Sequence, residues 1–569
     1  MVAREPGLAA LGDRLEHGLA IVSRPPCPAA LHPLRDRLAQ HGLLLVFALF
    51  VVFFGVAGFM LGGDGTPDLR IYHRYNGFAA VTGGRPQDIA PAQLQSFFYP
   101  GLDALYFRLT DALNAWPRLL SVLMALPYAP AAFLIFLAGR LTLPDDWPRR
   151  DGLAAAGALF GITGAAAFST LGTTMSEIVP GLPFLAGLAL WLSGVARPGR
   201  AGSGGFARIA AAGLLCGVTV GLKLTTVPLF VGLFLAVFLS ELPRGRRAIA
   251  AAVVFGACGV LATLVVAGPF WWSNYQLTGN PVFPAYNDIF RSDWVGPGRW
   301  TDERFKPQDW PSILLYPASW AFRLSNRAIE IHMRDPRMLM LLAAVALIAL
   351  KFVVAGREAW REPSTRRAGL VAVFLFVAFV LWQVQFSIYR YLSLIESYSG
   401  IVIVAAALMW GERRYAFIVG WLLICLGAYA VKATSYPWWS RSLPAPHAYE
   451  ASLPAVPDGA LVVFLDTSAL SHVIPGLPPG VRVITSNSNL VRPGDPGTLS
   501  RRIDATIRDF QGPIWGFENT RDFPGVADAT LAYHHLRRTS DCAPIRTNVD
   551  EAPHRGCRLE RVAEPASTP

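Results

Sequence analysis

Residues 42–77 read GLLLVFALFVVFFGVAGFMLGGDGTPDLRIYHRYNG, and this stretch decides the fold. Its first part, up to residue 62, is apolar and long enough to cross the hydrocarbon core of a bilayer, which takes ~20 such residues. A polar turn with Asp64 and Asp68 follows at once, and the segment from Leu69 to about Val81 has the pattern of an amphipathic helix. We therefore expect a membrane span that delivers reactive side chains to one face of the membrane.

The whole chain has the composition of a multi-span membrane protein. Of its 569 residues, 53% are hydrophobic and 16% are charged, which is too apolar for a soluble domain of this length. The length rule predicts a polytopic α-helical protein with about eleven spans. They are expected at 42–62, 117–140, 153–171, 178–196, 208–222, 224–241, 248–269, 336–354, 368–388, 394–410 and 415–431.

Charge predicts the orientation of these spans. The net charge of +11 comes almost wholly from arginine, which favours positively charged cytoplasmic loops over nucleic-acid binding. With a cytoplasmic N-terminal segment at 1–41, which lacks a cleavable signal peptide, every loop on the inside is short and rich in arginine. The arginines of these loops are Arg149, Arg150, Arg197, Arg200, Arg208, Arg244, Arg246, Arg247, Arg357, Arg361, Arg366, Arg367, Arg413 and Arg414. The transmembrane domain then covers 42–431, with a first outer loop at 63–116 and a second outer loop at 270–335.

The segment 432–569 is expected to be a small α/β domain on the outer side. Short apolar runs at 460–465 and 481–484 are typical of buried strands, and 501–510 is typical of a helix between strands. Cys542 and Cys557 lie close together in this polar tail, and in an oxidising compartment such a pair predicts a disulfide. An odd number of spans also puts the tail outside.

Polar residues gather on the outer side in this topology. They include Asp64, Asp68, His73, Arg74 and Asn76 in the first outer loop, and Glu177, Lys223, Arg390 and Glu396 at the outer turns. Charge in or near a bilayer is costly and is usually functional. Their convergence predicts a site at the outer membrane surface.

Two aspartates compete for the role of general base. Asp68 precedes the amphipathic helix and is either an N-cap or a carboxylate that takes a proton from an acceptor hydroxyl. Asp64 lies in a Gly-Asp-Gly turn, where aspartate is commonplace.

The remaining candidates are substrate-binding residues with structural alternatives. His73 and Asn76 share a helix face and either hold a sugar or phosphate or form structural hydrogen bonds. Lys223, beside Thr225 and Thr226, suits a lipid phosphate or snorkels to the interface. Arg390, within Tyr389-Arg390-Tyr391, offers a planar fork for phosphate or an ion pair with Glu396 or another carboxylate.

Two further patterns carry less information. The rigid, proline-rich segment 279–287, which includes Asn280, either shapes a groove or only packs. Histidines are scattered and no spacing matches a zinc site, so no metal ligands are predicted.

The order of spans, outer loops and C-terminal domain, together with three short sequence segments, resembles the GT-C superfamily of membrane glycosyltransferases. This superfamily includes protein O-mannosyltransferases and aminoarabinose transferases. The segments are DLRIYHRYNG at 68–77, GLKLT at 221–225 and GNPVFP at 279–284. The likeness covers most of residues 42–431. Many relatives carry adjacent acids after the first span, whereas here Asp64 and Asp68 are separated.

This resemblance implies transfer of a sugar from a polyprenyl-phosphate donor to an acceptor hydroxyl on a glycolipid, polysaccharide or protein. It implies Asp68, or else Asp64, as the base. The implied substrate-binding set is His73, Arg74, Asn76, Glu177, Lys223, Asn280, Arg390 and Tyr391. A bacterial inner membrane with the reaction on the periplasmic face is implied too, and some relatives need a divalent metal while others do not.

Two other functions fit the same features. A transporter or flippase of lipid-linked saccharides also needs basic and aromatic residues in a membrane cavity, but it predicts polar groups at the midplane and repeated halves. A polysaccharide polymerase or ligase would use a lipid-linked oligosaccharide on the same architecture.

Overall fold

The structure is a computed structural model that describes residues 42–84, 87–196, 203–442 and 445–562. The chain divides into two units, Met1–Phe50 and Val51–Pro569, and the contacts below lie within the second. The expected cytoplasmic segment 1–41 and the predicted loop residues Arg197 and Arg200 lie outside the described residues.

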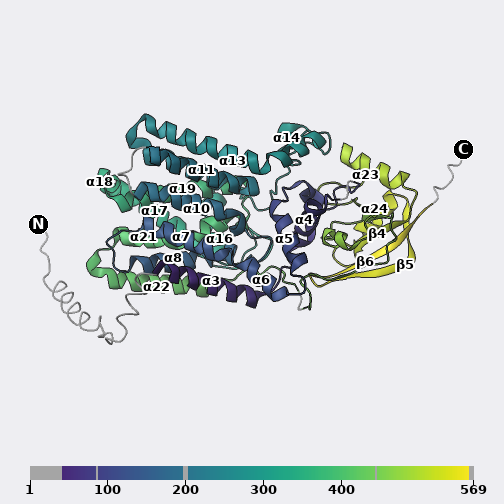
Figure 1. Cartoon of the computed structure of the whole chain (residues 1–569), viewed down its shortest axis with the longest axis horizontal. Helices are drawn as coiled ribbons and strands as arrows, with labels where there is room; N and C mark the ends of the chain where they lie inside the picture. The colour runs from purple at the N-terminus through teal and green to yellow at the C-terminus, as the bar shows by residue number, and fades with distance from the viewer. Residues whose placement is uncertain (1–41, 85–86, 197–202, 443–444, 563–569) are drawn as a thin grey trace, which may run out of the picture. The chain divides into compact units, whose positions relative to one another are not determined.

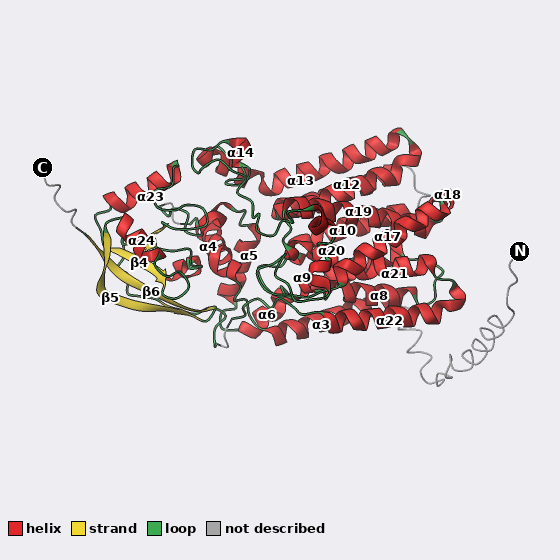
Figure 2. Cartoon of the chain, turned by 180° about the vertical axis from the view of Figure 1, so that it is seen from behind, coloured by secondary structure: helices red, strands yellow, loops and turns green. Residues whose placement is uncertain are grey.

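Helices form most of the described chain, and the strands come together in one sheet near its C-terminal end (Figure 1, Figure 2). The helices are α3 (Gly42–Leu61), η2 (Leu69–His73), α4 (Arg74–Thr82), η3 (Gln93–Phe97), α5 (Gly101–Ala112), α6 (Pro117–Ala125), α7 (Tyr128–Thr142), α8 (Arg150–Ile162), α9 (Ala165–Phe168), α10 (Ile178–Ala196), α11 (Ser203–Leu222), η4 (Leu224–Thr226), α12 (Val227–Glu241), η5 (Leu242–Arg244), α13 (Arg246–Thr278), α14 (Asn287–Phe290), α15 (Trp310–Leu314), α16 (Ala318–Ala321), α17 (Arg337–Ala355), α18 (Arg357–Arg361), α19 (Pro363–Gln385), η6 (Tyr389–Leu392), α20 (Ser393–Ser397), α21 (Ser399–Trp410), η7 (Arg413–Tyr415), α22 (Ala416–Ala433), η8 (Ser471–Gly476), α23 (Thr498–Asp509) and α24 (Val526–Tyr533). The strands are β1 (Ala451–Ser452), β2 (Leu461–Phe464), β3 (Arg482–Thr485), β4 (Ile514–Asn519), β5 (Leu536–Thr547) and β6 (Asp550–Arg561).

Among the described residues, nine helices are long and apolar enough to cross a membrane. The segment Tyr389–Ser397 with Ser399–Trp410, bent by 45°, makes up to ten. The chain is therefore a multi-pass helical membrane protein, as the sequence predicts.

The expected span at 153–171 is not one helix, and this part of the prediction is wrong. α8 ends at Ile162 after 13 residues, and the short helix α9 follows a turn at Gly164. A Cβ atom at Gly164 would lie 2.2 Å from Cδ of Glu396, so the side chain of a residue far along the chain occupies the space beside this turn. The Glu396 carboxylate also accepts hydrogen bonds from the amides of Ala166 and Ala167. An apolar run alone does not reveal a turn that depends on such a contact.

The arginine-rich loops contact one another at one end of the helices. The side chain of Arg413 donates to the carbonyl of Asp146 at 2.7 Å, and Arg367 forms an ion pair with Asp145 at 3.5 Å. The first outer loop follows one end of the transmembrane helices, and the arginine-rich loops join their opposite ends. The arginine-rich loops and the loop with the candidate site residues therefore lie at different ends of the helices. The side of the membrane that each end faces stays a prediction.

The C-terminal domain is the expected small α/β domain. Its sheet has the order β1-β5-β6-β4-β2-β3; β2 is parallel to β3 and β4, whereas β6 is antiparallel to β4 and β5. All four residues of β2 and all six of β4 are buried. Burial on both faces explains the continuous apolar run of β2, whereas β4 also buries the polar residues Glu518 and Asn519. The disulfide between Cys542 and Cys557 is present and joins β5 to β6.

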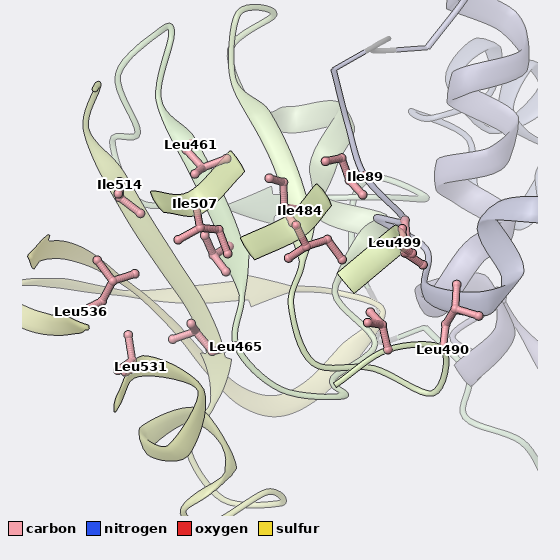
Figure 3. Packing of buried hydrophobic residues seen from close by; sticks show 14 of the residues in the cluster. Ile89, Leu461, Leu465, Ile484, Leu490, Leu499, Ile507, Ile514, Leu531 and Leu536 are labelled. Carbon is pink, nitrogen blue, oxygen red and sulfur yellow. The ribbon is translucent and has the colours of Figure 1, made fainter. Parts of the chain in front are cut away.

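The two outer loops belong to the same core as this domain. Ile89 of the first outer loop pairs with Ile484 of β3 in parallel, and the two side chains lie near each other (Figure 3). Phe283 and Val295 of the second outer loop are buried in the same cluster. The domain is thus packed against the loops that carry the candidate site.

A buried histidine links the domain to the first outer loop. His472 of η8 is fully buried, and its Nδ1 lies 3.3 Å from the carbonyl oxygen of Arg70. Burial lowers the pKa of His472 to about 3. Nearby, burial acts to raise the pKa of Asp550, but the hydrogen bond from His554 and the charge of Arg70 outweigh it and lower that pKa to about 2.

We expect the stability of this domain to fall as pH drops below 6.5. The unfolded chain protonates His472 near pH 6.5, whereas the folded chain resists protonation to about pH 3. Each unit by which the pH falls between these two values therefore lowers the free energy of unfolding by up to about 1.4 kcal/mol. His472→Asn should flatten the dependence of the thermal midpoint on pH between 6.5 and 4.5. His535→Asn, at an exposed position, is the control, and equal slopes for wild type and His472→Asn would contradict the assignment.

Candidate functional site

An ion pair between Asp68 and Arg390 lies at the centre of the candidate site. Asp68 comes directly before η2, and Arg390 lies in η6, 322 residues later. Nη1 of Arg390 donates to Oδ2 of Asp68 at 3.0 Å, and the two side chains are only 14% and 13% exposed. Tyr72 Oη donates to the same carboxylate oxygen at 3.4 Å, while Oδ1 of Asp68 has no hydrogen-bond partner among the described residues.

The N-cap reading of Asp68 is wrong. Asp68 stands at the N-cap position of η2, but its backbone is helical, with φ −66° and ψ −37°, and its side chain makes no capping hydrogen bond. The carboxylate is directed to Arg390 instead. The ion-pair alternative for Arg390 is therefore realised, with Asp68 rather than Glu396 as its partner.

A second ion pair lies near the first. Nζ of Lys223 is 2.7 Å from Oε1 of Glu177, and Glu177 is almost fully buried while Lys223 is 23% exposed. Tyr391 interacts electrostatically with all four charged groups, Arg390, Glu177, Lys223 and Asp68. The structure thus brings together five of the residues that the sequence singles out, from four separate segments of the chain.

The second outer loop adds charges that the sequence does not single out. Arg304 contacts Asp302 at 2.6 Å and Glu330 at 3.8 Å, and Arg390 interacts electrostatically with each of the three. Burial acts to raise the pKa of Asp302, but hydrogen bonds from Arg304 outweigh it, so the pKa is lowered. Only the fold reveals their proximity to Arg390.

Asp64, the rival base, has both carboxylate oxygens occupied. Oδ1 accepts from the amide of Thr66 at 2.9 Å, and Oδ2 accepts from the amide and the hydroxyl of Thr174, each at 2.7 Å. The backbone beside it forms a bridge with Arg441. These contacts fasten the first outer loop to the turn after α9.

The three polar residues of η2 and α4 lie in structural contacts. Nδ1 of His73 is 2.6 Å from Oδ1 of Asp103, and its buried Nε2 has no partner among the described residues. Arg74 stacks on the ring of Tyr449, 3.4 Å from the centroid. The amide of Asn76 donates to the carbonyl of Gln95 at 2.9 Å.

Asn280 is fully buried within its own loop. Its side-chain amide donates to the carbonyl of Ala285 at 2.9 Å, and its side-chain oxygen accepts from the amide of Val282 at 3.0 Å. Both ends of the side chain therefore hold the proline-rich segment in shape.

A buried network includes Glu396, which the sequence places at an outer turn, and two residues that the sequence does not single out, Asp335 and Arg337. Arg337 donates to Asp335 at 2.8 Å, and both side chains are fully buried. Asp335 also accepts from the amide of Ala165 at 2.8 Å, while Tyr389 donates to Glu396. The carboxylates hold α9 against α17 and α20. The sequence gives no signal that Glu396 and Asp335 both contact α9, because these contacts depend on the tertiary fold.

Within the described ranges, no group of three or more His, Cys, Asp or Glu side chains is arranged to hold a metal ion.

Comparison with known proteins gives one structural similarity. No protein-family model and no curated protein matches the chain. The chain is similar to the crystal structure of ArnT from Cupriavidus metallidurans bound to undecaprenyl phosphate, with 12% identity and a TM-score of 0.44, over 91% of this chain and 98% of that one. At this identity and TM-score, no residue role is transferred from that structure to this chain.

Proposed function

We propose that the chain is a membrane glycosyltransferase that moves a sugar from a polyprenyl-phosphate donor to an acceptor hydroxyl. The observation that carries the proposal is the Asp68–Arg390 pair: a carboxylate with one uncommitted oxygen beside a guanidinium, at the end of the transmembrane helices. Such a pair supplies a general base and an anion-binding group in one place.

The proposed reaction is a single displacement. The acceptor oxygen attacks the anomeric carbon while its proton passes to the Asp68 carboxylate. The bond between the anomeric carbon and the phosphate oxygen breaks, and the lipid phosphate leaves with the electron pair. Positive groups aimed at that phosphate stabilise the charge that grows on it in the transition state.

Arg390 and Lys223 are the proposed phosphate-binding groups. A guanidinium has five N–H donors and an ammonium has three, and the ion pairs leave most of these available. Arrival of the donor phosphate would compete with Asp68 for Arg390. The carboxylate is then released from its ion pair when the donor is bound, so the base becomes available only in the loaded site.

Asp68 is preferred to Asp64 as the base because the two carboxylates differ in the hydrogen bonds that they already accept. Three short hydrogen bonds occupy most of the roughly four acceptor sites of the Asp64 carboxylate and involve both of its oxygens. One oxygen of Asp68 has no such commitment within the described chain.

The remaining predicted residues support the site in this proposal. Glu177 and Tyr391 orient Lys223 and Arg390, while Arg74, Asn76 and Asn280 hold the outer loops in place. Nε2 of His73, a buried atom without a hydrogen-bond partner among the described residues, is the proposed contact of this histidine with substrate.

We place the reaction on the periplasmic face of a bacterial inner membrane, with the N-terminus in the cytoplasm. The arginine-rich loops at the other end of the helices support this orientation. The disulfide between Cys542 and Cys557 supports an oxidising compartment for the C-terminal domain.

The test is to reconstitute the full chain in liposomes with a panel of undecaprenyl-phosphate sugars, aminoarabinose, mannose and glucose among them, and an envelope glycan extract. We expect release of undecaprenyl phosphate and a mass increase of one sugar on an acceptor. Movement of the intact donor between leaflets without any covalent change would instead identify a flippase.

A further inference from the structure

A cavity of about 180 Å³ lies between the second outer loop and the C-terminal domain. One wall contains Trp294, Gly296 and Trp300, and the other contains Leu490, Asp495 and Ser500. An apolar cavity of about 150 Å³ accommodates a benzene-sized ring. This cavity therefore has room for a single six-membered ring.

The loop wall of the cavity is fixed to the domain wall. The amides of Thr498 and Leu499, in the first turn of α23, donate to the carbonyls of Asp293 and Trp294 at 2.9 and 3.1 Å. Gly497 permits this approach, because a Cβ atom there would lie 2.6 Å from the carbonyl oxygen of Trp294. Ligand binding therefore needs little ordering of the chain, which favours affinity.

Asn287 holds the loop itself in shape. It is 1% exposed, and its side-chain amide lies 3.0 to 3.3 Å from the carbonyls of Ser292, Val295 and Gly296. The indole N–H of Trp300 donates to the carbonyl of Gly296 at 3.1 Å. The indole is therefore anchored by its one polar atom, and its remaining surface offers only apolar contact.

The chemistry of the lining favours a neutral polyhydroxylated ring. Two indoles suit the C–H face of a pyranose, and binding pockets are typically apolar with a few polar groups that fix orientation. Asp495 uses one carboxylate oxygen to accept from the amide of Arg492 at 2.8 Å. No hydrogen bond of the Ser500 hydroxyl is found in the described chain, although Ser500 is 3% exposed. Among the described residues, the lining contains no lysine or arginine, which disfavours a phosphate, although the guanidinium of Arg502 lies 5.9 Å from the centroid of the Trp294 ring.

We propose that this cavity binds one pyranose ring of the acceptor glycan. The proposal rests on the proposed function, since it names the acceptor class for that same reaction. The same loop serves both sites: Trp300 is two residues before Asp302, which lies near Arg390. A glycan held at Trp294 and Trp300 can extend from there along the loop toward Asp68.

The direct test is saturation-transfer NMR on the full chain in detergent with methyl glucoside, methyl galactoside and methyl mannoside as probes, and cyclohexanol as a ring without the hydroxyl pattern. We expect at least one pyranoside to receive more saturation than cyclohexanol. Gly296→Leu should weaken its binding by about tenfold or more, because a Cβ at Gly296 meets no atom within 4 Å and the new side chain fills the cavity. Gly152→Leu, at an equally open glycine of α8, is the matched control.

A second pair of variants keeps the proposal testable if Gly296→Leu misfolds the loop. Asp495→Asn keeps the acceptor for the Arg492 amide but removes the charge, and it should also weaken pyranoside binding. Asp458→Asn is its control, because Asp458 is likewise exposed and accepts one backbone hydrogen bond, from Gly480 at 2.7 Å. Binding that is unchanged in both Gly296→Leu and Asp495→Asn, or no binding by wild type, would overturn the proposal.

The outcome separates this proposal from the proposed function. Pyranoside binding is measured without donor, so it should persist in Asp68→Asn even where transfer is lost. If pyranosides bind at this cavity and no undecaprenyl phosphate is ever released, the transferase fails and the cavity remains a pyranose-binding site without an acceptor role. If transfer occurs and Gly296→Leu leaves the acceptor KM unchanged, the cavity assignment fails and the transferase stands.

Discussion

Asp68→Asn is expected to lower turnover with a polyprenyl-phosphate sugar by about 10²- to 10⁴-fold, the usual contribution of a general base. Asparagine keeps the shape and can still accept from Arg390, but its amide oxygen cannot take up the acceptor proton. Single-turnover transfer at saturating donor, measured with reconstituted protein, isolates this step from donor binding. We expect the rate to fall while donor affinity stays the same or rises, because asparagine carries no charge to compete with the donor phosphate for Arg390.

Asp64→Asn is the comparison that tests the choice of base. An amide at position 64 would direct N–H groups toward amides that already donate, so we expect lost stability rather than a selective loss of turnover. If Asp64→Asn remains folded and inactive while Asp68→Asn turns over normally, the two roles are reversed.

Arg337→Met is expected to destabilise the transmembrane unit by about 3 to 5 kcal/mol, the cost of leaving a buried charge uncompensated. Asp335 is fully buried, and Arg337 also donates to the hydroxyl of Thr434 at 2.7 Å and to the carbonyl of Phe160 at 3.0 Å. Removing the guanidinium breaks all three contacts. Equilibrium unfolding of the detergent-solubilised chain in mixed micelles measures the loss.

The control for Arg337 is Arg414→Met. Arg414 lies 2.7 Å from Glu412, but each side chain is 62% exposed, so this pair should contribute no more than about 1 kcal/mol. Asp335→Asn combined with Arg337→Met should recover part of the stability. Similar losses for Arg337→Met and Arg414→Met would show that the buried network does not stabilise the bundle.

Much of the fold follows from local sequence. Most long apolar runs form the expected helices. The runs at 460–465 and 481–484, predicted as buried strands, coincide with β2 and, shifted by one residue, with β3. The prediction of one span at 153–171 is wrong because the break between α8 and α9 depends on the carboxylate of Glu396, some 230 residues away. Hydropathy does not contain that contact.

Some residues of the candidate site stand out from the sequence, but their partners do not. Charge beside apolar runs is costly, so Asp68, Lys223 and Arg390 stand out from position alone. Their pairing depends on tertiary contacts across hundreds of residues, as does the commitment of Asp64 to Thr174. Asp302 and Glu330 were missed because they lie in a loop of mixed charge, where an acidic side chain is ordinary.

The central claim is that Asp68 acts as the base in transfer from a lipid-linked sugar. Its most direct test is mass spectrometry of polyprenyl-phosphate sugars and envelope glycans from cells with the gene, without it, and with Asp68→Asn restored at wild-type protein level. We predict that a lipid-linked sugar accumulates and one glycan loses a residue without the gene, and that Asp68→Asn fails to reverse either change. Full reversal by Asp68→Asn, or glycans that never change, would contradict this account.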